Sequence, residues 1–263
     1  MYLLLNNNKY LSQIVESLLF CLIYNNKECK LISKIDKLDE VNIFIIFNFN
    51  NIKYLPKNFI IYNFEQLCSS KNINESYYEK CKHAKVIFDY SVNNIKVYES
   101  KNLNCYHLPF GWTPVIEPIN IINFDNKNID LIFLGNINKR RLEIIKNFDI
   151  YHSDKCFESN YENICSHAKF SLNIHYYKGE SILEVSRIIP LICRGIIVIT
   201  EKSDDIFYDD IFKDICIFVD FDDINNIKNI IKNFSKEKAI NNKNILIEKL
   251  NYLKIITDKI NLF

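Results

Sequence analysis

Glycine, proline, tryptophan and methionine are scarce in this chain, which has 4 Gly, 5 Pro, 1 Trp and 1 Met among 263 residues. The dinucleotide fingerprint G-x-G-x-x-G and the phosphate loop G-x-x-x-x-G-K-[ST] are both absent, which argues against NAD binding and against that type of ATPase. The G-x-S-x-G elbow of serine hydrolases is also absent. Because glycines are so few, we expect each of them to lie where the backbone cannot accept a side chain. They are Gly111, Gly135, Gly179 and Gly195.

An excess of charge of either sign is also lacking, since 33 Lys and Arg face 32 Asp and Glu. Binding to the phosphates of a nucleic acid usually leaves a basic footprint, so we expect no nucleic-acid partner. A local anion site stays open, because a net charge does not describe a patch. The hydrophobic fraction of 48% is large enough for a sizeable core and excludes global disorder.

Long apolar runs and paired cysteines are missing as well. The opening "MYLLLNNNKY" is too short for a signal peptide, and "SLLFCLIY" is too short to span a bilayer. The nine cysteines are odd in number, show no C-x-x-C spacing and mostly adjoin apolar residues, which favours buried reduced thiols over disulfides or zinc. We therefore expect a cytoplasmic protein without a transmembrane segment. The histidines have no metal-like spacing, and the paired aspartates are typical of solvated loops, so no metal site and no cofactor are expected.

Short apolar runs alternate with amphipathic stretches along most of the chain, which predicts an α/β fold with mainly parallel sheets. The pattern fails over residues 111–128, "GWTPVIEPINIINFDNKN", which we interpret as a linker. The predicted architecture is two Rossmann-like lobes, a short one over residues 1–115 and another over residues 116–263. Ligands in such sheets bind beyond the carboxyl ends of the strands, which would face a cleft.

The segment "DLIFLGNINKRRLEII" predicts a strand, a tight turn at Gly135 and a helix that begins near Asn138. The N–H groups at such a helix start bind anions, and Lys139, Arg140 and Arg141 would add positive charge. The alternative is an ordinary strand–helix turn followed by a solvated basic face.

The second informative segment is "LNIHYYKGESILEVSRIIPLICRGIIVITEKSDD". Glu184 and Arg187 are three residues apart and share a helix face, where a carboxylate could accept ribose hydroxyls and a guanidinium could bind a diphosphate. Alternatively, Ser181 and Glu184 form an S-x-x-E capping box, and Arg187 only pairs with Glu184. Pro190 is expected to kink this helix or to begin a new one, and Gly195 fits the left-handed position after its end.

His175 lies near the end of the predicted strand "KFSLNIHYY", before a loop. Such a position suits an imidazole that faces a substrate, although a lone histidine at a strand end is more often structural.

Together these blocks resemble the C-terminal lobe of GT-B glycosyltransferases, in particular the group-1-like and spore-protein (CgeB-like) branch. The resemblance runs through "HAKVIFDYSVNNIKVYESKNLNCYHLPFGW", "LIFLGNINKRRLEII", "HAKFSLNIHYY" and "ILEVSRIIPLICRGIIVITE", roughly residues 83–220. It implies a nucleotide-diphosphate sugar as co-substrate, bound mainly by the second lobe, an acceptor bound by the first, and no essential metal. The resemblance places Gly135, Asn138, Lys139 and Arg140 at the diphosphate, His175, Glu180 and Ser181 near the sugar and phosphates, Glu184 and Arg187 toward the nucleotide, and the segment from Glu201 to Asp205 at the rim of the cleft.

The sequence departs from that family in two places. Retaining members carry two glutamates seven residues apart, and Pro190 occupies the position of the second one. The loop after the first strand, "NNNKYLSQ", is not glycine-rich. The leading hypothesis is a metal-independent, hexosyltransferase-like enzyme with His175 and Glu180 as catalytic candidates and a glycan, protein or small molecule as acceptor. The alternative is a non-catalytic nucleotide- or sugar-binding module of a glycosylation assembly, and a plain α/β scaffold is the third reading.

Overall fold

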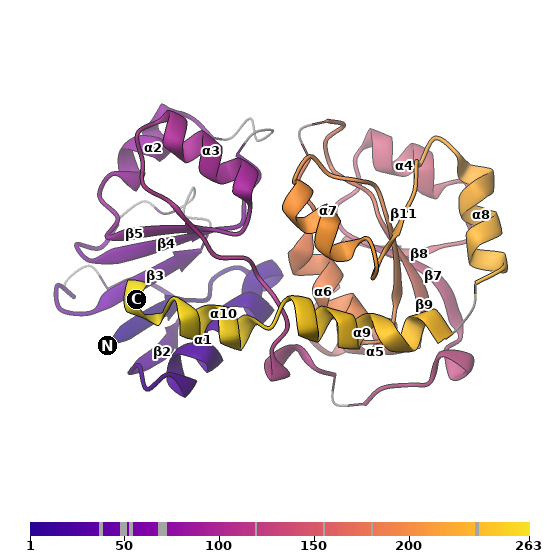
Figure 1. The fold of residues 1–263 in the computed structure, drawn as a ribbon, viewed down its shortest axis with the longest axis horizontal. Helices are drawn as coiled ribbons and strands as arrows, with labels where there is room; N and C mark the ends of the chain where they lie inside the picture. The colour runs from indigo at the N-terminus through magenta and orange to yellow at the C-terminus, as the bar shows by residue number, and fades with distance from the viewer. Residues whose placement is uncertain are drawn as a thin grey trace. The chain divides into compact units, whose positions relative to one another are not determined.

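The computed structural model describes residues 1–36, 39–47, 52, 55–67, 73–118, 120–154, 156–179, 181–234 and 237–263. Strands and helices alternate through most of this part of the chain (Figure 1). The strands are β1 Tyr2–Leu5, β2 Cys29–Ile32, β3 Ile43–Phe47, β4 Phe59–Asn63, β5 Val86–Asp89, β6 Tyr106–His107, β7 Ile129–Leu134, β8 Tyr151–Ser153, β9 Ala168–Asn173, β10 Ile197–Thr200 and β11 Ile217–Phe218. The α-helices are α1 Ser12–Tyr24, α2 Glu75–Cys81, α3 Val92–Ser100, α4 Lys139–Ile145, α5 Glu158–His167, α6 Val185–Cys193, α7 Ile206–Phe212, α8 Ile224–Lys232, α9 Glu237–Lys249 and α10 Tyr252–Asp258.

The chain forms two compact units, and the first consists of Met1–Val115 together with Leu250–Phe263. Its six strands pair in parallel in the order β2-β1-β3-β4-β5-β6. Figure 1 shows α2 and α3 on one face of this sheet and α1 and α10 on the other. Because both faces are covered, the central strands β3 and β4 are apolar along almost their whole length and buried.

The second unit, Ile116–Lys249, holds a five-stranded parallel sheet in the order β11-β10-β9-β7-β8. The strand order reverses between β7 and β9, since β8 lies outside β7 while β10 and β11 lie beyond β9. Such a reversal opens a crevice at the carboxyl ends of the two strands, where open α/β sheets bind ligands. The two parallel sheets confirm the predicted α/β class with two Rossmann-like units.

Two buried cations tie the start of the second unit to its body. The Nζ of Lys127 donates hydrogen bonds to the carbonyls of Ala168 at 2.9 Å and Arg194 at 2.8 Å. Arg194 donates to the carbonyl of Ile116 and pairs with Glu162. These bonds place the second half of the expected linker 111–128 within the second unit. The division of the chain falls between Val115 and Ile116, inside that segment.

The expected second lobe, residues 116–263, is wrong at its end, because Leu250–Phe263 belongs to the first unit. Trp112 N donates to the carbonyl of Leu250 at 2.7 Å, and Tyr252 N donates to the carbonyl of Trp112 at 2.9 Å. Helix α10 then buries Tyr252 and Ile256 in the first unit. The sequence pattern predicts helices at the C-terminal end of the chain, but the unit against which a helix packs depends on contacts distant in sequence.

The alternative interpretation of Ser181 and Glu184 as a capping box is wrong. Helix α6 begins only at Val185, after Glu184, whose side chain makes no capping hydrogen bond. The helix continues through Pro190, so the proline does not begin a new helix, and the expected kink stays a prediction. The ring removes one backbone donor, but the residues around it from Ile188 to Cys193 are buried, and their packing offsets that loss. Gly195 has a φ of 66°, the predicted left-handed position after the helix.

Candidate functional site

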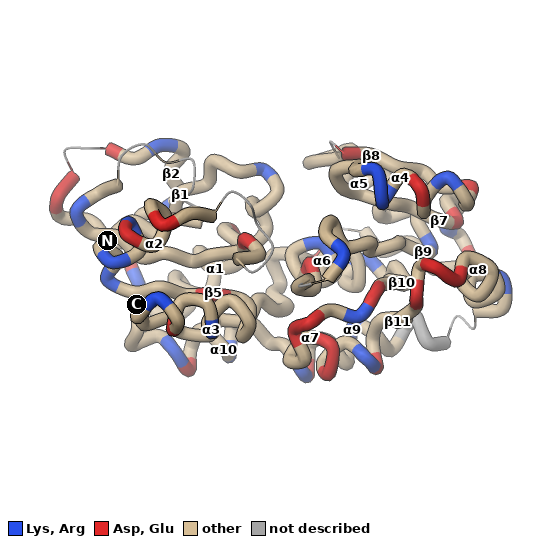
Figure 2. The backbone as a smooth tube through the Cα atoms, turned by 90° about the horizontal axis from the view of Figure 1, so that it is seen from above, with Lys and Arg blue, Asp and Glu red and all other residues tan. Residues whose placement is uncertain are grey.

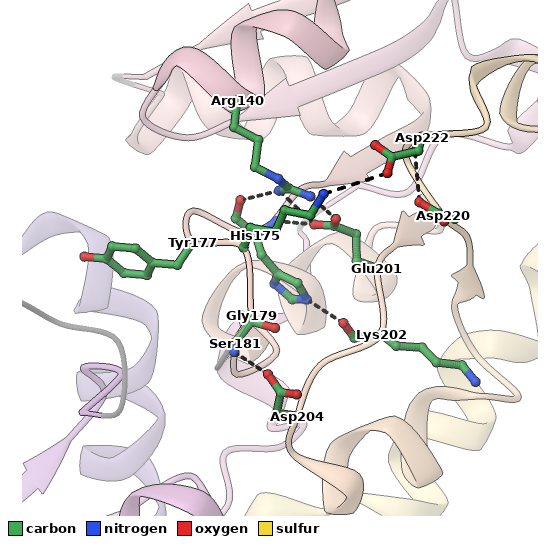
Figure 3. Close-up of a pocket in the computed structure, with 11 residues that line it drawn as sticks. Arg140, His175, Tyr177, Gly179, Ser181, Glu201, Lys202, Asp204, Asp220 and Asp222 are labelled. Atoms are coloured by element: carbon green, nitrogen blue, oxygen red, sulfur yellow. Dashed lines mark hydrogen bonds and ion pairs between the residues drawn. The ribbon is translucent and has the colours of Figure 1, made fainter.

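A polar pocket of about 170 Å³ lies in the second unit, next to the carboxyl ends of β9 and β10 (Figure 3). Four residues of the expected donor site line it, namely Arg140, His175, Ser181 and Glu201. The other lining residues are Tyr177, Lys178, Gly179, Lys202, Asp204, Asp220 and Asp222. The remaining expected residues that the structure describes, Gly135, Asn138, Lys139, Glu184 and Arg187, do not line the pocket. Glu180, a predicted catalytic residue, lies outside the described residues.

The basic triplet at the start of α4 points in three directions, because successive helical residues are about 100° apart. Lys139 is exposed, Arg140 lines the pocket, and Arg141 is buried. Asn138 caps the helix by accepting a hydrogen bond from Arg141 N at 2.9 Å. The predicted helix start is therefore confirmed. The three basic side chains lie in three different environments, and only Arg140 lines the pocket.

Side chains from this helix start bind three successive carbonyls of the chain that leaves β9. Asn138 Nδ2 donates to the carbonyl of Tyr176 at 2.7 Å. Arg140 Nη1 donates to the carbonyl of His175 at 2.9 Å, and Arg141 donates to that of Ile174 through Nε at 2.9 Å and Nη2 at 2.6 Å. The predicted strand 169–177 ends at Asn173, so these carbonyls have no partner strand, and the side chains satisfy them instead.

Glu201 links Arg140 to the backbone of His175. Its carboxylate forms an ion pair with the Arg140 guanidinium and accepts a hydrogen bond from His175 N at 2.8 Å. Arg140 and Glu201 are both mostly shielded, with 25% and 16% of their side chains exposed. The pair therefore has a low-dielectric setting, and an anion that reaches Arg140 would compete with this carboxylate.

The ring of His175 is buried and both of its nitrogens face acceptors. Nδ1 lies 2.9 Å from Glu184 Oε2. Nε2 lies 3.2 Å from the carbonyl of Lys202 (Figure 3). Burial acts to lower the pKa of His175, but the charge and hydrogen bond of Glu184, followed by Glu201 and the Lys202 carbonyl, raise it above its ordinary value. Only the imidazolium donates from both nitrogens, so the geometry favours the charged form.

Glu184 lies at the centre of a charged network beneath the pocket. Its Oε2 accepts hydrogen bonds from His175 and, at 2.9 Å, from Asn173 Nδ2. Burial acts to raise its pKa, but His175, Arg187 and Asn173 outweigh burial and lower the pKa of Glu184 to about 2. Its Oε1 is buried, has no hydrogen-bond partner among the described residues, and lies 3.6 Å from Arg141 Nη2.

Arg187 packs against the turn at Gly135. A Cβ built on this glycine would lie 2.9 Å from Arg187 Nη2, and the glycine has a φ of 156°. Arg187 Nη1 donates to Asn173 Oδ1 at 2.9 Å, and the guanidinium faces the ring of Phe133. The expectation that a side chain has no room at Gly135 is thereby confirmed, and the absent Cβ is what lets Arg187 approach the turn.

Ser181 connects the loop after β9 to the segment after β10. Ser181 N donates to Asp204 Oδ2 at 2.7 Å, and Asp204 N donates to the carbonyl of Ser181 at 2.8 Å.

Acidic positions gather along α7 and the segments that lead into α7 and α8 (Figure 2). The described residues contain no group of three or more His, Cys, Asp or Glu side chains arranged to hold a metal ion.

The sequence did not predict the roles of three residues in this network. Arg141 is buried at its centre, and Asn173 bridges Glu184 and Arg187. Asp204 is the partner of Ser181. Asn173 is a polar residue in the apolar strand "FSLNI", and that contrast was an available signal. No comparable signal marks Arg141 within a basic triplet.

Solved structures share this fold over nearly the whole chain. The alpha-glucosyltransferase in complex with UDP-glucose and DNA containing an abasic site has a TM-score of 0.67 at 12% identity, with 99% of this chain and 98% of that chain covered. Anabaena HepE in complex with UDP and glucose has a TM-score of 0.57 at 8% identity, with 99% and 98% covered. Sucrose-phosphate synthase from Thermosynechococcus elongatus has a TM-score of 0.55 at 11% identity, with 84% and 72% covered.

The fold is that of the GT-B glycosyltransferases. No protein-family profile matches the sequence, and no curated protein is similar to it. The resemblance to the GT-B fold is thus confirmed, whereas the CgeB-like branch stays a prediction. DNA is bound in one of these GT-B structures, so the expected lack of a nucleic-acid partner also stays a prediction. None of the described helices has the length and apolarity that a membrane crossing requires.

Proposed function

We propose that this chain is a glycosyltransferase that moves a hexose from a uridine-diphosphate sugar to an acceptor. The observation that carries the proposal is the pocket at the carboxyl ends of β9 and β10, lined by Arg140, His175, Ser181 and Glu201 of the expected donor site. The fold supports it, because solved proteins of the same fold hold UDP or UDP-glucose. The second unit is therefore proposed as the donor side and the first unit as the acceptor side.

In the proposed reaction the oxygen of an acceptor hydroxyl attacks the anomeric carbon, the bond from that carbon to the diphosphate oxygen breaks, and the hydroxyl proton passes to the departing diphosphate or to water. The electron pair leaves with UDP, so negative charge develops on the diphosphate. Arg140, Arg187 and the exposed Lys139 are the proposed cations for this charge, with the N–H groups of the turn at Gly135 and Asn138. A guanidinium suits this role because its fork matches phosphate oxygens. We propose that no metal ion is needed.

Glu184 and His175 are proposed to act on the geometry of the site. The Glu184 carboxylate accepts a hydrogen bond from the side-chain amide of Asn173, and this amide accepts one from Arg187. Glu184 thus orients the Arg187 guanidinium through the Asn173 side chain. His175 holds the segment after β10 through the Lys202 carbonyl. Both of its ring nitrogens are engaged, which favours orientation of the sugar pocket over proton donation. A direct contact of Glu184 with the nucleotide and the catalytic role of Glu180 stay predictions.

The proposal is tested by thermal unfolding of wild type, Arg187→Met and Arg140→Met against UDP, GDP, ADP, CDP and their glucose conjugates. A ligand at 100 times its Kd adds about 2.7 kcal/mol of stability, which gives a readable rise in Tm. We expect a rise with UDP and UDP-glucose that both variants lose. The control is Lys146→Met, an exposed position of the segment that follows α4, which should keep the rise.

Transfer is measured next, as UDP release from UDP-glucose with panels of glycan, protein, small-molecule and DNA acceptors. UDP release that depends on an acceptor supports the enzyme. A Tm rise without release or hydrolysis across the panel would favour the non-catalytic binding module, which the proline at position 190 also favours. No Tm rise with any nucleotide would overturn both and leave the scaffold reading.

A further inference from the structure

Arg141 binds three separate segments of the second unit through its guanidinium. Its Nη1 donates to the carbonyl of Asn136 at 2.8 Å, and its Nε and Nη2 both donate to the carbonyl of Ile174. Nη2 also lies 3.6 Å from Glu184 Oε1. A single guanidinium thus joins the turn after β7, the end of β9 and the start of α6.

The surroundings of Arg141 keep it away from ligands. The residue is 3% exposed and is not among the residues that line the pocket. Its guanidinium carbon lies 5.3 Å from the centre of the Phe133 ring and 5.1 Å from that of the Tyr176 ring. Burial between two rings holds a planar guanidinium in one orientation, and the fixed fork then sets the positions of the groups it binds.

The three groups that Arg141 binds each adjoin a residue of the proposed donor site. Asn136 follows Gly135, against which Arg187 packs. Ile174 precedes His175, whose backbone N and carbonyl bind Glu201 and Arg140. Glu184 pairs with His175 and, through Asn173, orients Arg187. Movement of any of these groups would displace a cation of the site.

We propose that Arg141 is the positioning residue of this donor site, fixing the Gly135 turn, the His175 backbone and the Glu184 carboxylate without touching the ligand. This inference rests on the proposed function for its effect on UDP binding. Its structural part concerns the chain alone and can be tested separately.

Two substitutions distinguish the positive charge of Arg141 from the several hydrogen bonds that its guanidinium donates. Arg141→Lys keeps a cation near Glu184 but reaches fewer carbonyls, whereas Arg141→Met removes both. We expect both folded variants to bind UDP about tenfold more weakly or worse, since small misplacements of binding groups are costly. Amide hydrogen exchange at residues 135–137 and 174–176 should be faster in both, and Lys146→Met should change neither quantity.

The titration of His175 gives a readout that general destabilisation would not move. The groups that act on His175 are Glu184, Glu201, the Lys202 carbonyl, Asp209, and Arg140 at the His175 carbonyl, while Glu184 faces Arg141, Arg187 and Asn173. Without the cation at position 141, Glu184 is less compensated and favours the imidazolium more strongly. The NMR titration midpoint of His175, assigned with His175→Gln, should rise in Arg141→Met and return to the wild-type value in Arg141→Lys.

Wild-type UDP affinity and wild-type amide exchange in Arg141→Lys would overturn the inference, as would an unchanged His175 midpoint in a folded Arg141→Met. If Arg141→Met does not fold, the exchange and affinity of Arg141→Lys decide. If the wild-type protein itself does not bind UDP, the proposed function fails, and the exchange rates still decide whether Arg141 holds the three segments.

Discussion

At the scale of single residues, His175 and Glu184 form a buried pair whose pKa values move in opposite directions. The pKa of His175 is raised from 6.5, so its contribution to stability is complete below 6.5 and is lost as the pH rises through the folded-state pKa. The pKa of Glu184 is lowered from 4.5 to about 2, so its contribution is complete above 4.5 and is lost as the pH falls toward 2. The pair should therefore stabilise the second unit most between pH 4.5 and 6.5.

We expect His175→Gln to lower the free energy of unfolding more at pH 5.5 than at pH 8.5, since the stability that the raised pKa of His175 contributes is complete below 6.5 and declines as the pH rises toward the folded-state pKa. The loss at pH 5.5 should be on the order of 3 kcal/mol, the cost of breaking a buried ion pair. Urea unfolding followed by circular dichroism measures both values. His152→Gln, an exposed position in β8, is the matched control. Equal losses at the two pH values would show that folding does not raise the pKa of His175.

The residue scale also shows where sequence reasoning stops. Lys139, Arg140 and Arg141 are a plain basic triplet in the sequence, and all could face an anion. Their roles differ because α4 starts at Lys139 and because β9 ends at Asn173, leaving three carbonyls to be satisfied. Neither boundary is fixed by composition to the accuracy of one residue, and one residue turns a side chain by about 100°.

At the scale of elements, most strands and helices were predictable because continuous apolar runs indicate strands covered on both faces. The segment "VNNIKVYES" predicts a helix over residues 92–100, and α3 has these bounds, Val92–Ser100. Helix α7, Ile206–Phe212, was missed because the acidic segment before it was interpreted as a loop. Asp205 caps this helix by accepting from Phe207 N at 3.2 Å, and an aspartate before an apolar run was the available signal.

The turn between β7 and α4 contains Gly135, and Arg187 of α6 packs against it. In Gly135→Ala, the new Cβ would meet the guanidinium at 2.9 Å and displace it from the turn. We expect the rise in Tm with UDP to shrink, while the protein without ligand loses about 1 kcal/mol of stability from the strained backbone. Gly195→Ala is the control, because Gly195 has a φ of 66°, the nearest atom to its Cβ would be Lys127 Nζ at 4.0 Å, and the residue does not line the pocket. An undiminished UDP effect in Gly135→Ala would contradict the close approach.

At the scale of the whole molecule, the alternation of elements predicted two Rossmann-like units but not the unit to which the last helix belongs. The final segment buries Leu250, Tyr252 and Ile256 within the first unit. Tyr252 packs on Phe110 with ring centres 5.3 Å apart, and Phe263 stacks on Phe88 at 4.7 Å. The amphipathic pattern of "NYLKIITDKI" shows that one face is buried, but it contains nothing that specifies which surface buries it.

Deletion of Leu250–Phe263 should therefore unfold the first unit and spare the second. Each fully buried apolar side chain contributes about 1.5–3 kcal/mol, so the loss of three amounts to a large part of the 5–15 kcal/mol by which a domain is usually stable. Trp112, the single tryptophan of the chain, bonds to Leu250 and reports on the first unit by its fluorescence. We expect an unfolded-type Trp112 spectrum, rapid amide exchange in β3 and β4, and retained protection in β7 and β9. Protected amides in β3 and β4 of the truncated chain would show that the first unit folds without Leu250–Phe263. The prediction that this segment is needed for the stability of the first unit would then be wrong.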